Sequence, residues 1–179
     1  MKPLLCLCLL LPVLIPSAGS QGEADGDVYQ APEAFIAESF DGAPPAPSAL
    51  WLSKAMRDEV KAILGHEYAA LRVRYWRNGA RTAWILDEIG KVKPITTGIV
   101  VLDGRIERLK VLVYRESHGW EVKHPFFTER FRDATLTNGG DLSRPIDNIA
   151  GATLSVNALK RLAALALYLD RQAQPARAP

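Results

Sequence analysis

The stretch Ile95–Tyr114, ITTGIVVLDGRIERLKVLVY, decides the fold of this 179-residue chain. Two runs rich in Val, Ile and Leu lie on either side of Asp103-Gly104, and such runs favour β-strands. An Asp-Gly pair between two strands favours a tight turn. The pattern therefore predicts an antiparallel hairpin.

A second hairpin is predicted immediately upstream. Apolar and polar residues alternate in LRVRYWR and again in ARTAWILDEI, and Asn78-Gly79 separates these two runs. Asn-Gly between alternating segments is the strongest short-range signal for a hairpin. The two hairpins together predict four antiparallel strands.

Helices are expected before and after these four strands in the chain. Ser48 is a potential N-cap for the segment ALWLSKAMRDEVKAIL, and Gly65 is expected to end that helix. One face of the helix carries an apolar stripe, which consists of Leu52, Met56, Val60 and Ile63. A short helix is expected to begin at Pro125, with apolar contributions from Phe126, Phe127 and Phe131.

The last helix is predicted from Thr153 to Arg171, after a loop over residues 132–148. Its spacing predicts a buried face formed by Leu154, Ala158, Leu162, Leu165 and Leu169. The fold class that follows is α+β: an antiparallel sheet of hairpins with packed helices, closed by the C-terminal helix.

The N-terminal residues differ in composition from the rest of the chain. Residues 1–20 contain Lys2 and the apolar run PLLCLCLLLPVLI, followed by small residues, which is the pattern of a secretory signal peptide cleaved near Ser20. The apolar run contains prolines and is shorter than the ~20 residues of a membrane-spanning helix. We therefore expect an exported protein, in the periplasm or otherwise outside the cytoplasm.

Three further segments are predicted downstream. Residues 21–47 are rich in Ala, Pro, Gly and acidic residues and are expected to form an extended lead-in outside the core. Residues 48–171 are expected to form one domain, followed by a disordered tail over residues 172–179.

The composition excludes several function classes. Cys6 and Cys8 both lie in the predicted signal peptide, so the mature chain would have no disulfide, thiolate metal site or catalytic cysteine. The net charge of +2 falls to +1 without Lys2, which is too small to indicate nucleic-acid binding. The three histidines have no zinc-site spacing, and no G-x-S-x-G elbow is present.

The segment around Thr153 is the main candidate site. A helix that begins near Thr153 places unpaired N–H groups and a positive dipole end beside that hydroxyl, and Gly151 permits a tight turn. A phosphate is stabilised at such a terminus. Alternatively, Thr153 is an ordinary N-cap and Gly151 an ordinary turn residue.

Asp147–Ser155, DNIAGATLS, resembles the flavinylation motif D-x-x-[ST]-G-A-T-x-[ST] of the FMN-binding domain family. This family includes subunits of the sodium-pumping NADH:quinone oxidoreductase and of the Rnf complex. In it, the phosphate of FMN esterifies the threonine of G-A-T, and an exported, magnesium-dependent flavin transferase performs the reaction with FAD. The resemblance implies that Thr153 carries covalent FMN.

The same resemblance implies a recognition frame around Thr153, which consists of Asp147, Gly151, Ala152 and Ser155. The sequence departs from the motif at Ala150, where Ser or Thr is more usual. That departure removes one hydroxyl from the frame.

A second block, VLVYRESHGWEVKHPFFTERF, resembles the family's stretch in which a strand ends in E-[ST]-x-G and leads to a short aromatic helix. Gly119 would allow close approach of the flavin ring, and Trp120 would stack on it. Glu116, Ser117 and Glu121 would contact the ring's heteroatoms or order the loop. Lys91–Lys93 either places positive charge near the reduced flavin or is a solvated turn.

These features lead to the hypothesis of an exported flavoprotein that carries FMN on Thr153 and relays electrons between membrane or periplasmic redox partners. No acid–base pair for converting a metabolite is evident, so electron transfer is favoured over enzymatic catalysis. One alternative is a periplasmic binding or assembly module with noncovalent flavin or none. Another is a structural subunit that docks a membrane partner through the helix predicted over residues 48–65.

Overall fold

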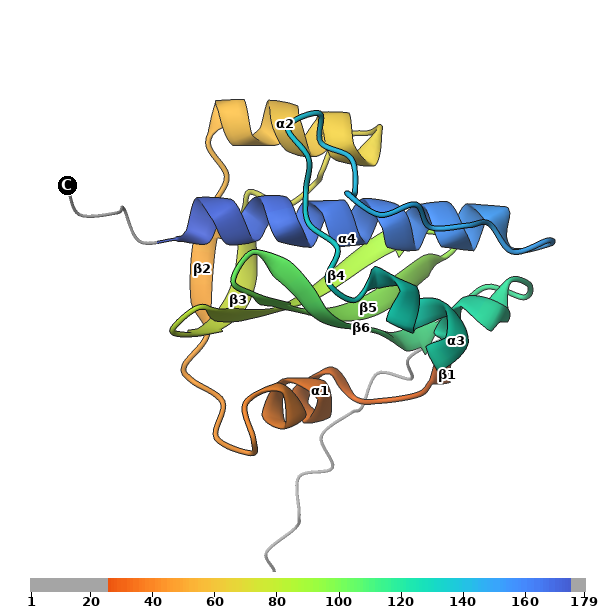
Figure 1. The fold of residues 1–179 in the computed structure, drawn as a ribbon, viewed down its shortest axis with the longest axis horizontal. Helices are drawn as coiled ribbons and strands as arrows, with labels where there is room; N and C mark the ends of the chain where they lie inside the picture. The colour runs from red at the N-terminus through yellow and green to blue at the C-terminus, as the bar shows by residue number, and fades with distance from the viewer. Residues whose placement is uncertain (1–25, 175–179) are drawn as a thin grey trace, which may run out of the picture.

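The computed structural model describes residues 26–174 as a six-stranded antiparallel sheet with helices on both faces (Figure 1). The strand order is β1-β6-β5-β4-β3-β2. The predicted signal peptide, residues 1–20, and the end of the predicted tail, residues 175–179, lie outside the described residues. The α+β class, with a C-terminal helix packed on an antiparallel sheet, is confirmed.

Both predicted hairpins form the centre of the sheet. β3 (Arg72–Asn78) pairs with β4 (Arg81–Ile89), and β5 (Pro94–Leu102) pairs with β6 (Arg105–Tyr114). At the second turn, Asp103 has φ 50° and Gly104 has φ 73°. Both angles lie in the left-handed region that a two-residue hairpin turn requires, which explains why the local sequence predicts this turn well.

α4 (Thr153–Ala173) covers one face of the sheet together with α2 (Lys54–Leu64) (Figure 1). Trp84, Ile99 and Ile106 of the sheet are fully buried in the same core as Leu159 and Leu162 of α4. The predicted buried face of the helix is confirmed at Ala158, Leu162, Leu165 and Leu169. The prediction is wrong for Leu154, which is 50% exposed because it lies in the first turn of α4, at a pocket described below.

Residues 21–47 are predicted to be extended and outside the core. That prediction is wrong for the part of this segment that folds onto the sheet. β1 (Asp27–Val28) pairs with the end of β6, and α1 (Pro32–Ser39) packs on the face of the sheet opposite α4 (Figure 1). Phe35 is fully buried there, and a Cβ built on Gly98 would lie 2.6 Å from its ring. The helix therefore depends on a space that a glycine in β5 provides, which the local composition of residues 21–47 does not reveal.

The predicted start of the helix at Ser48 is also wrong. Residues Ser48–Trp51 form the edge strand β2, which pairs with β3. The N-cap of α2 is Ser53, whose Oγ accepts a hydrogen bond from the backbone N–H of Met56 at 3.2 Å, while Gly65 with φ 80° ends the helix as predicted. The helix proposed as a membrane-docking element therefore lacks Trp51 and Leu52.

The remaining short helices follow β6. They are η1 (Trp120–Lys123), α3 (Pro125–Thr128) and η2 (Glu129–Phe131). The predicted helix start at Pro125 is confirmed, and Phe127 and Phe131 are fully buried, whereas Phe126 is 58% exposed. Within residues 26–174, none of the helices is long and apolar enough to cross a membrane.

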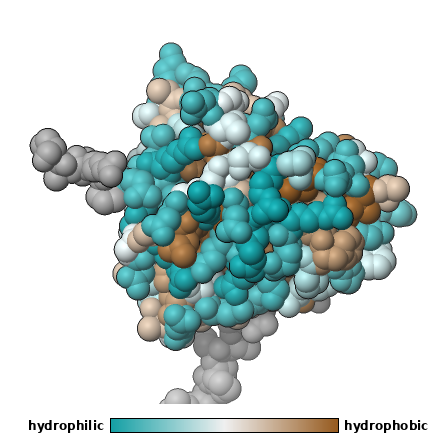
Figure 2. Space-filling model, viewed as in Figure 1, coloured by the Kyte–Doolittle hydropathy of each residue, from teal (hydrophilic) through white to brown (hydrophobic). Residues whose placement is uncertain are grey.

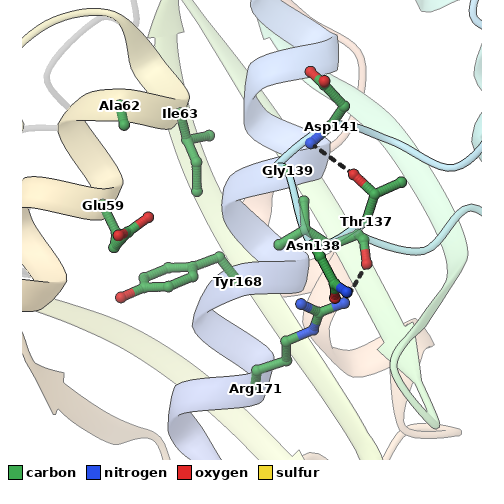
Figure 3. Close-up of a pocket in the computed structure, with 11 residues that line it drawn as sticks. Glu59, Ala62, Ile63, Thr137, Asn138, Gly139, Asp141, Tyr168 and Arg171 are labelled. Carbon is green, nitrogen blue, oxygen red and sulfur yellow. Dashed lines mark hydrogen bonds between the residues drawn. The ribbon is translucent and has the colours of Figure 1, made fainter.

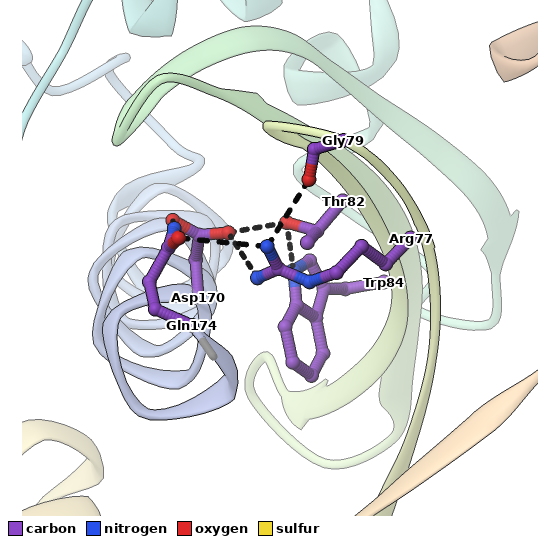
Figure 4. Close-up of polar contacts among 6 residues, drawn as sticks. All are labelled: Arg77, Gly79, Thr82, Trp84, Asp170 and Gln174. Atoms are coloured by element: carbon purple, nitrogen blue, oxygen red, sulfur yellow. Dashed lines mark hydrogen bonds and ion pairs between the residues drawn. The ribbon is translucent and has the colours of Figure 1, made fainter. Parts of the chain in front are cut away.

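A buried polar network attaches the end of α4 to the sheet (Figure 4). The fully buried Asp170 accepts a hydrogen bond from Thr82 at 2.7 Å, and the Thr82 hydroxyl accepts one from the indole N–H of Trp84 at 3.0 Å. Arg77 lies 3.7 Å from the same carboxylate. Because a buried carboxylate is costly without partners, these contacts fix the orientation of α4 on the sheet.

We predict that Phe35→Ala destabilises the protein by about 3–5 kcal/mol, because the substitution empties the space between α1 and Gly98. Phe126→Ala is the matched control, since that side chain is 58% exposed and its removal should change stability by about 0.5 kcal/mol or less. Denaturant unfolding of both variants measures the difference. Equal stabilities would show that α1 is not part of the cooperative fold.

Candidate functional site

The two blocks of candidate residues meet at a pocket with a volume of about 400 Å³. One wall comes from the start of α4, and the other comes from the β4–β5 turn and the loop after β6. The lining residues are Lys91, Glu116, Ser117, His118, Gly151, Ala152, Thr153, Leu154 and Ser155. Six predicted site residues therefore lie together although 35 positions separate Ser117 from Ala152 in the chain.

Thr153 is the first residue of α4, and its side chain is exposed on the pocket. The N-cap position is occupied by Ala152, with φ −118°, and no side chain caps the helix. The alternative in which Thr153 is an ordinary N-cap does not hold, because the threonine lies one position inside the helix. The N–H groups of the first turn have no partner within the helix and point toward its N-terminal end.

Ser155 joins the two walls of the pocket. Its Oγ lies 2.9 Å from the hydroxyl of Tyr114, and that hydroxyl donates a hydrogen bond to the carbonyl of His118 at 2.5 Å. Ser155 is 4% exposed, and burial raises the pKa of Tyr114. The phenol therefore stays protonated at neutral pH and can make both bonds at once.

Gly119 also lies at the contact between the two walls of the pocket. A Cβ at this position would lie 2.7 Å from Ser155 Oγ and 3.0 Å from the hydroxyl of Tyr114, and φ is +84°. The sequence predicts that Gly119 leaves room for a flavin ring. In the structure, the missing side chain leaves room for the start of α4, since Ala152 Cα is the next neighbour at 3.4 Å.

Glu116 orders the β4–β5 turn. Its Oε1 accepts hydrogen bonds from the backbone N–H groups of Lys91, Val92 and Lys93 at 2.5, 2.6 and 2.9 Å. Burial opposes ionisation of Glu116, but these three donors and the charge of Lys91 outweigh burial and lower the pKa of the carboxyl. Of the two roles predicted for Glu116, ordering the loop is the one for which contacts are present.

Four predicted residues do not line the pocket: Gly119, described above, and Trp120, Glu121 and Asp147. Trp120 is 48% exposed and makes an edge-to-face contact with His124 at 5.4 Å between ring centroids. Glu121 is partly buried, and its Oε2 has no hydrogen-bond partner among the described residues. Asp147 is exposed and lies 3.6 Å from Arg130 in an ion pair. The pocket itself therefore consists of fewer motif residues than the sequence suggests.

The structure adds His118 and Leu154 to the site, and it places Lys91, for which the sequence leaves two alternatives, at the pocket. Leu154 is predicted on the buried face of the helix but lines the pocket instead. Lys91 lies in the pocket wall, which favours the first of the two predictions for the turn at residues 91–93. The contact that links Lys91 to the site is the hydrogen bond from its backbone N–H to Glu116, which lies 25 positions later in the chain.

Large apolar side chains are exposed in the segments that line the pocket and in the short helices after them. They include Val92 at 71%, Leu154 at 50%, Trp120 at 48% and Phe126 at 58% exposure. Figure 2 shows hydrophobic residues at the end of the molecule where α3 and the start of α4 lie in Figure 1. An exposed cluster of large apolar side chains beside a pocket indicates a surface for contact with another molecule.

A different pocket, of about 320 Å³, lies between α2, α4 and the loop over residues 136–141 (Figure 3). Glu59, Tyr168 and Arg171 lie on its walls, and Arg171 donates a hydrogen bond to the carbonyl of Leu136. It contains none of the predicted site residues. The candidate site is therefore the pocket at the start of α4.

The donor set of that pocket fits a phosphorylated ligand with a planar, partly apolar body. The helix N-terminus and the ammonium of Lys91 favour an anion. Leu154 and Ala152 contribute apolar surface, and Ser117 and His118 contribute polar groups beside it. A volume near 400 Å³ is within the ordinary range of small-molecule sites.

This pocket, at the start of the last helix, has the composition expected of a site for a phosphorylated cofactor. Residues 90–168 match the family described as the FMN-binding domain. This part of the chain is therefore similar to an FMN-binding domain, which supports FMN as its ligand. No curated protein and no solved structure matches the chain.

We predict that Glu116→Gln lowers stability at neutral pH by roughly 1 kcal/mol, because charge-assisted bonds to the turn are weakened at a partly exposed position. The folded-state pKa of Glu116 is lowered. The contribution of its carboxylate is therefore fully present above the ordinary glutamate pKa and is lost as the pH falls through the lowered value.

Thermal unfolding of Glu116→Gln and wild type between neutral and acidic pH tests this expectation. The difference in Tm should shrink as the pH falls, whereas Glu33→Gln, an exposed change in α1, should show no such trend. A difference that stays constant with pH would contradict the assigned role of the carboxylate.

Proposed function

We propose that this protein is an exported flavoprotein that carries FMN through a phosphoester to Thr153 and relays electrons in an extracytoplasmic redox chain. The observation that supports the covalent link most directly is the position of Thr153. Its side chain is exposed on the pocket, at the first residue of a 21-residue helix that no side chain caps.

The chemistry of the link is a transfer of FMN from FAD. The bond from Thr153 Oγ to the phosphorus of the FMN moiety forms, the phosphoanhydride bond to AMP breaks, and the hydroxyl proton is released. An exported, magnesium-dependent flavin transferase is the proposed modifying enzyme. The N–H groups at the start of α4 would then stabilise the remaining charge of the phosphodiester.

A role in electron transfer is supported by what surrounds the pocket. Val92, Leu154 and Trp120 are exposed near it, and exposed apolar side chains beside a redox cofactor suit brief contacts with membrane or periplasmic redox partners. A tether also has a clear purpose outside the cytoplasm, where a released cofactor would be lost by dilution.

A second candidate keeps the flavin but omits the covalent link. Ala150 stands where the flavinylation motif has a hydroxyl residue, and it is exposed two residues before Ala152. If the transferase requires that hydroxyl, FMN would be held noncovalently in a binding or assembly module. The two candidates differ in whether flavin remains bound after denaturation.

We predict that protein co-expressed with a flavin transferase and purified from the exported fraction gains the mass of FMN less one water. Intact mass spectrometry under denaturing conditions measures this gain, and fragmentation should place it on Thr153. The same spectrum reports whether the chain is cleaved near Ser20. Thr153→Ala should lose the added mass completely, while Thr153→Ser, which keeps a hydroxyl, should retain it at least in part.

Folding is the necessary control for these variants. Because Thr153 is exposed and makes no capping bond, Thr153→Ala should unfold within about 0.5 kcal/mol of wild type. An added FMN mass on the Thr153→Ala protein would overturn the assignment of the attachment site. An unmodified wild-type chain that still binds FMN would favour the noncovalent candidate.

A further inference from the structure

The β4–β5 turn, residues Gly90–Lys93, holds a positive charge against the flavin pocket. Lys91 lines the pocket and Lys93 does not, although both lysines belong to the same turn. The backbone conformation of the turn decides which of the two lysines lines the pocket. Contacts from elsewhere in the fold impose that conformation.

Glu116 imposes that conformation. A single carboxylate oxygen accepts three consecutive backbone N–H groups, from Lys91 to Lys93, at distances between 2.5 and 2.9 Å. The turn is also closed by a bond from the N–H of Gly90 to the carbonyl of Lys93 at 3.1 Å. A concave set of successive N–H groups around one anion is a recognised anion-binding arrangement.

Gly90 makes room for the carboxylate. A Cβ at Gly90 would lie 3.0 Å from Glu116 Oε1 and 3.0 Å from Ile95 Cδ1. The side of the turn that faces β6 is therefore filled by Glu116 and Ile95. Lys91 is exposed and is among the residues that line the pocket.

The charges around the pocket favour Lys91 as the group that acts on a ligand. The carboxylate of Glu116 is already engaged by three N–H donors through Oε1, which offsets part of its negative charge. His118 shares a hydrogen bond with Ser117 through Nδ1 at 2.9 Å. Lys91 is the lysine among the residues that line the pocket together with Thr153, and its side chain carries an ammonium group.

We propose that Lys91, positioned by Glu116, stabilises the anionic reduced form of the flavin and so raises its reduction potential. This inference rests on the flavin role proposed above. A flavin that takes up two electrons from its redox donor and one proton carries a negative charge on the ring, whereas the oxidised ring is neutral. A fixed cation at the ring therefore favours the reduced form by Coulomb attraction. The phosphate charge is the same in both forms, so a cation that acts only on the phosphate leaves the potential unchanged.

The test compares Lys91→Gln with Lys93→Gln. Both variants remove one positive charge from the same turn, so they match in net charge and in local composition. Spectroelectrochemical titration of the FMN-loaded protein should show a more negative midpoint potential for Lys91→Gln and a clearly smaller shift for Lys93→Gln. Lys91→Arg, which keeps the charge, should restore most of the wild-type value. Equal shifts in the two glutamine variants, or no shift in either, would overturn the proposal.

A second measurement separates this proposal from the covalent link. In Thr153→Ala protein the tether is absent, and the dissociation constants of oxidised and reduced FMN can be measured separately by titration under anaerobic conditions. In that background, Lys91→Gln should raise the dissociation constant of reduced FMN by a larger factor than that of oxidised FMN. Equal weakening of both forms would assign Lys91 to the phosphate and overturn its role at the ring, whatever the mass spectrum of the wild-type protein shows. If neither form of FMN binds to any variant, the flavin assignment fails and this inference fails with it.

Discussion

The contact between Tyr114 and Ser155 is the interaction on which the site depends. Tyr114 ends β6 and Ser155 lies in the first turn of α4, so a hydrogen bond of 2.9 Å connects the two blocks of sequence that form the pocket. The same phenol bonds to the carbonyl of His118 and thereby orients the loop before η1. Gly119 completes this joint, because any side chain there would displace Ser155 or Tyr114. This hydrogen bond acts together with the shared core, in which Val122, Ala152 and Val156 are buried, to fix the start of α4 against the loop after β6.

The fold was predictable wherever the signal is local. Asp103-Gly104 specifies its turn through the backbone angles that both residues adopt. The first turn lies one position later than the predicted Asn78-Gly79: Asn78 ends β3 and pairs with Arg81, and Gly79, with φ 59°, is the turn residue in the left-handed region. The start of α2 was not predictable in the same way, because Ser48 and Ser53 are equally good caps in isolation. Only the pairing of residues 48–51 with β3 decides between them, and that pairing is a tertiary contact.

The same distinction explains what the sequence reveals of the site. Thr153 and its neighbours form a contiguous motif at a helix start, so their grouping follows from local structure. For Lys91–Lys93 the sequence leaves two alternatives, because the contact that holds this turn comes from a carboxylate 25 positions after Lys91 and is tertiary. Trp120 shows the opposite case. It directly follows Gly119 in the second block, yet its ring contacts His124 and it does not line the pocket.

The N-cap of α4 departs from the rules that α2 follows. α2 begins with Ser53, whose hydroxyl satisfies a backbone N–H of the first turn. α4 is the longest helix of the described residues and begins after Ala152, which supplies no such group, at a cost of about 1 kcal/mol relative to a serine or aspartate cap. The buried face of α4 and the network around Asp170 supply stability that offsets this cost. An uncapped helix start that opens on a pocket leaves its N–H groups to an external acceptor. In the function proposed above, that acceptor is the phosphate of the cofactor. A helix start without a cap, offset by stabilising contacts elsewhere, is the kind of local exception that functional sites show.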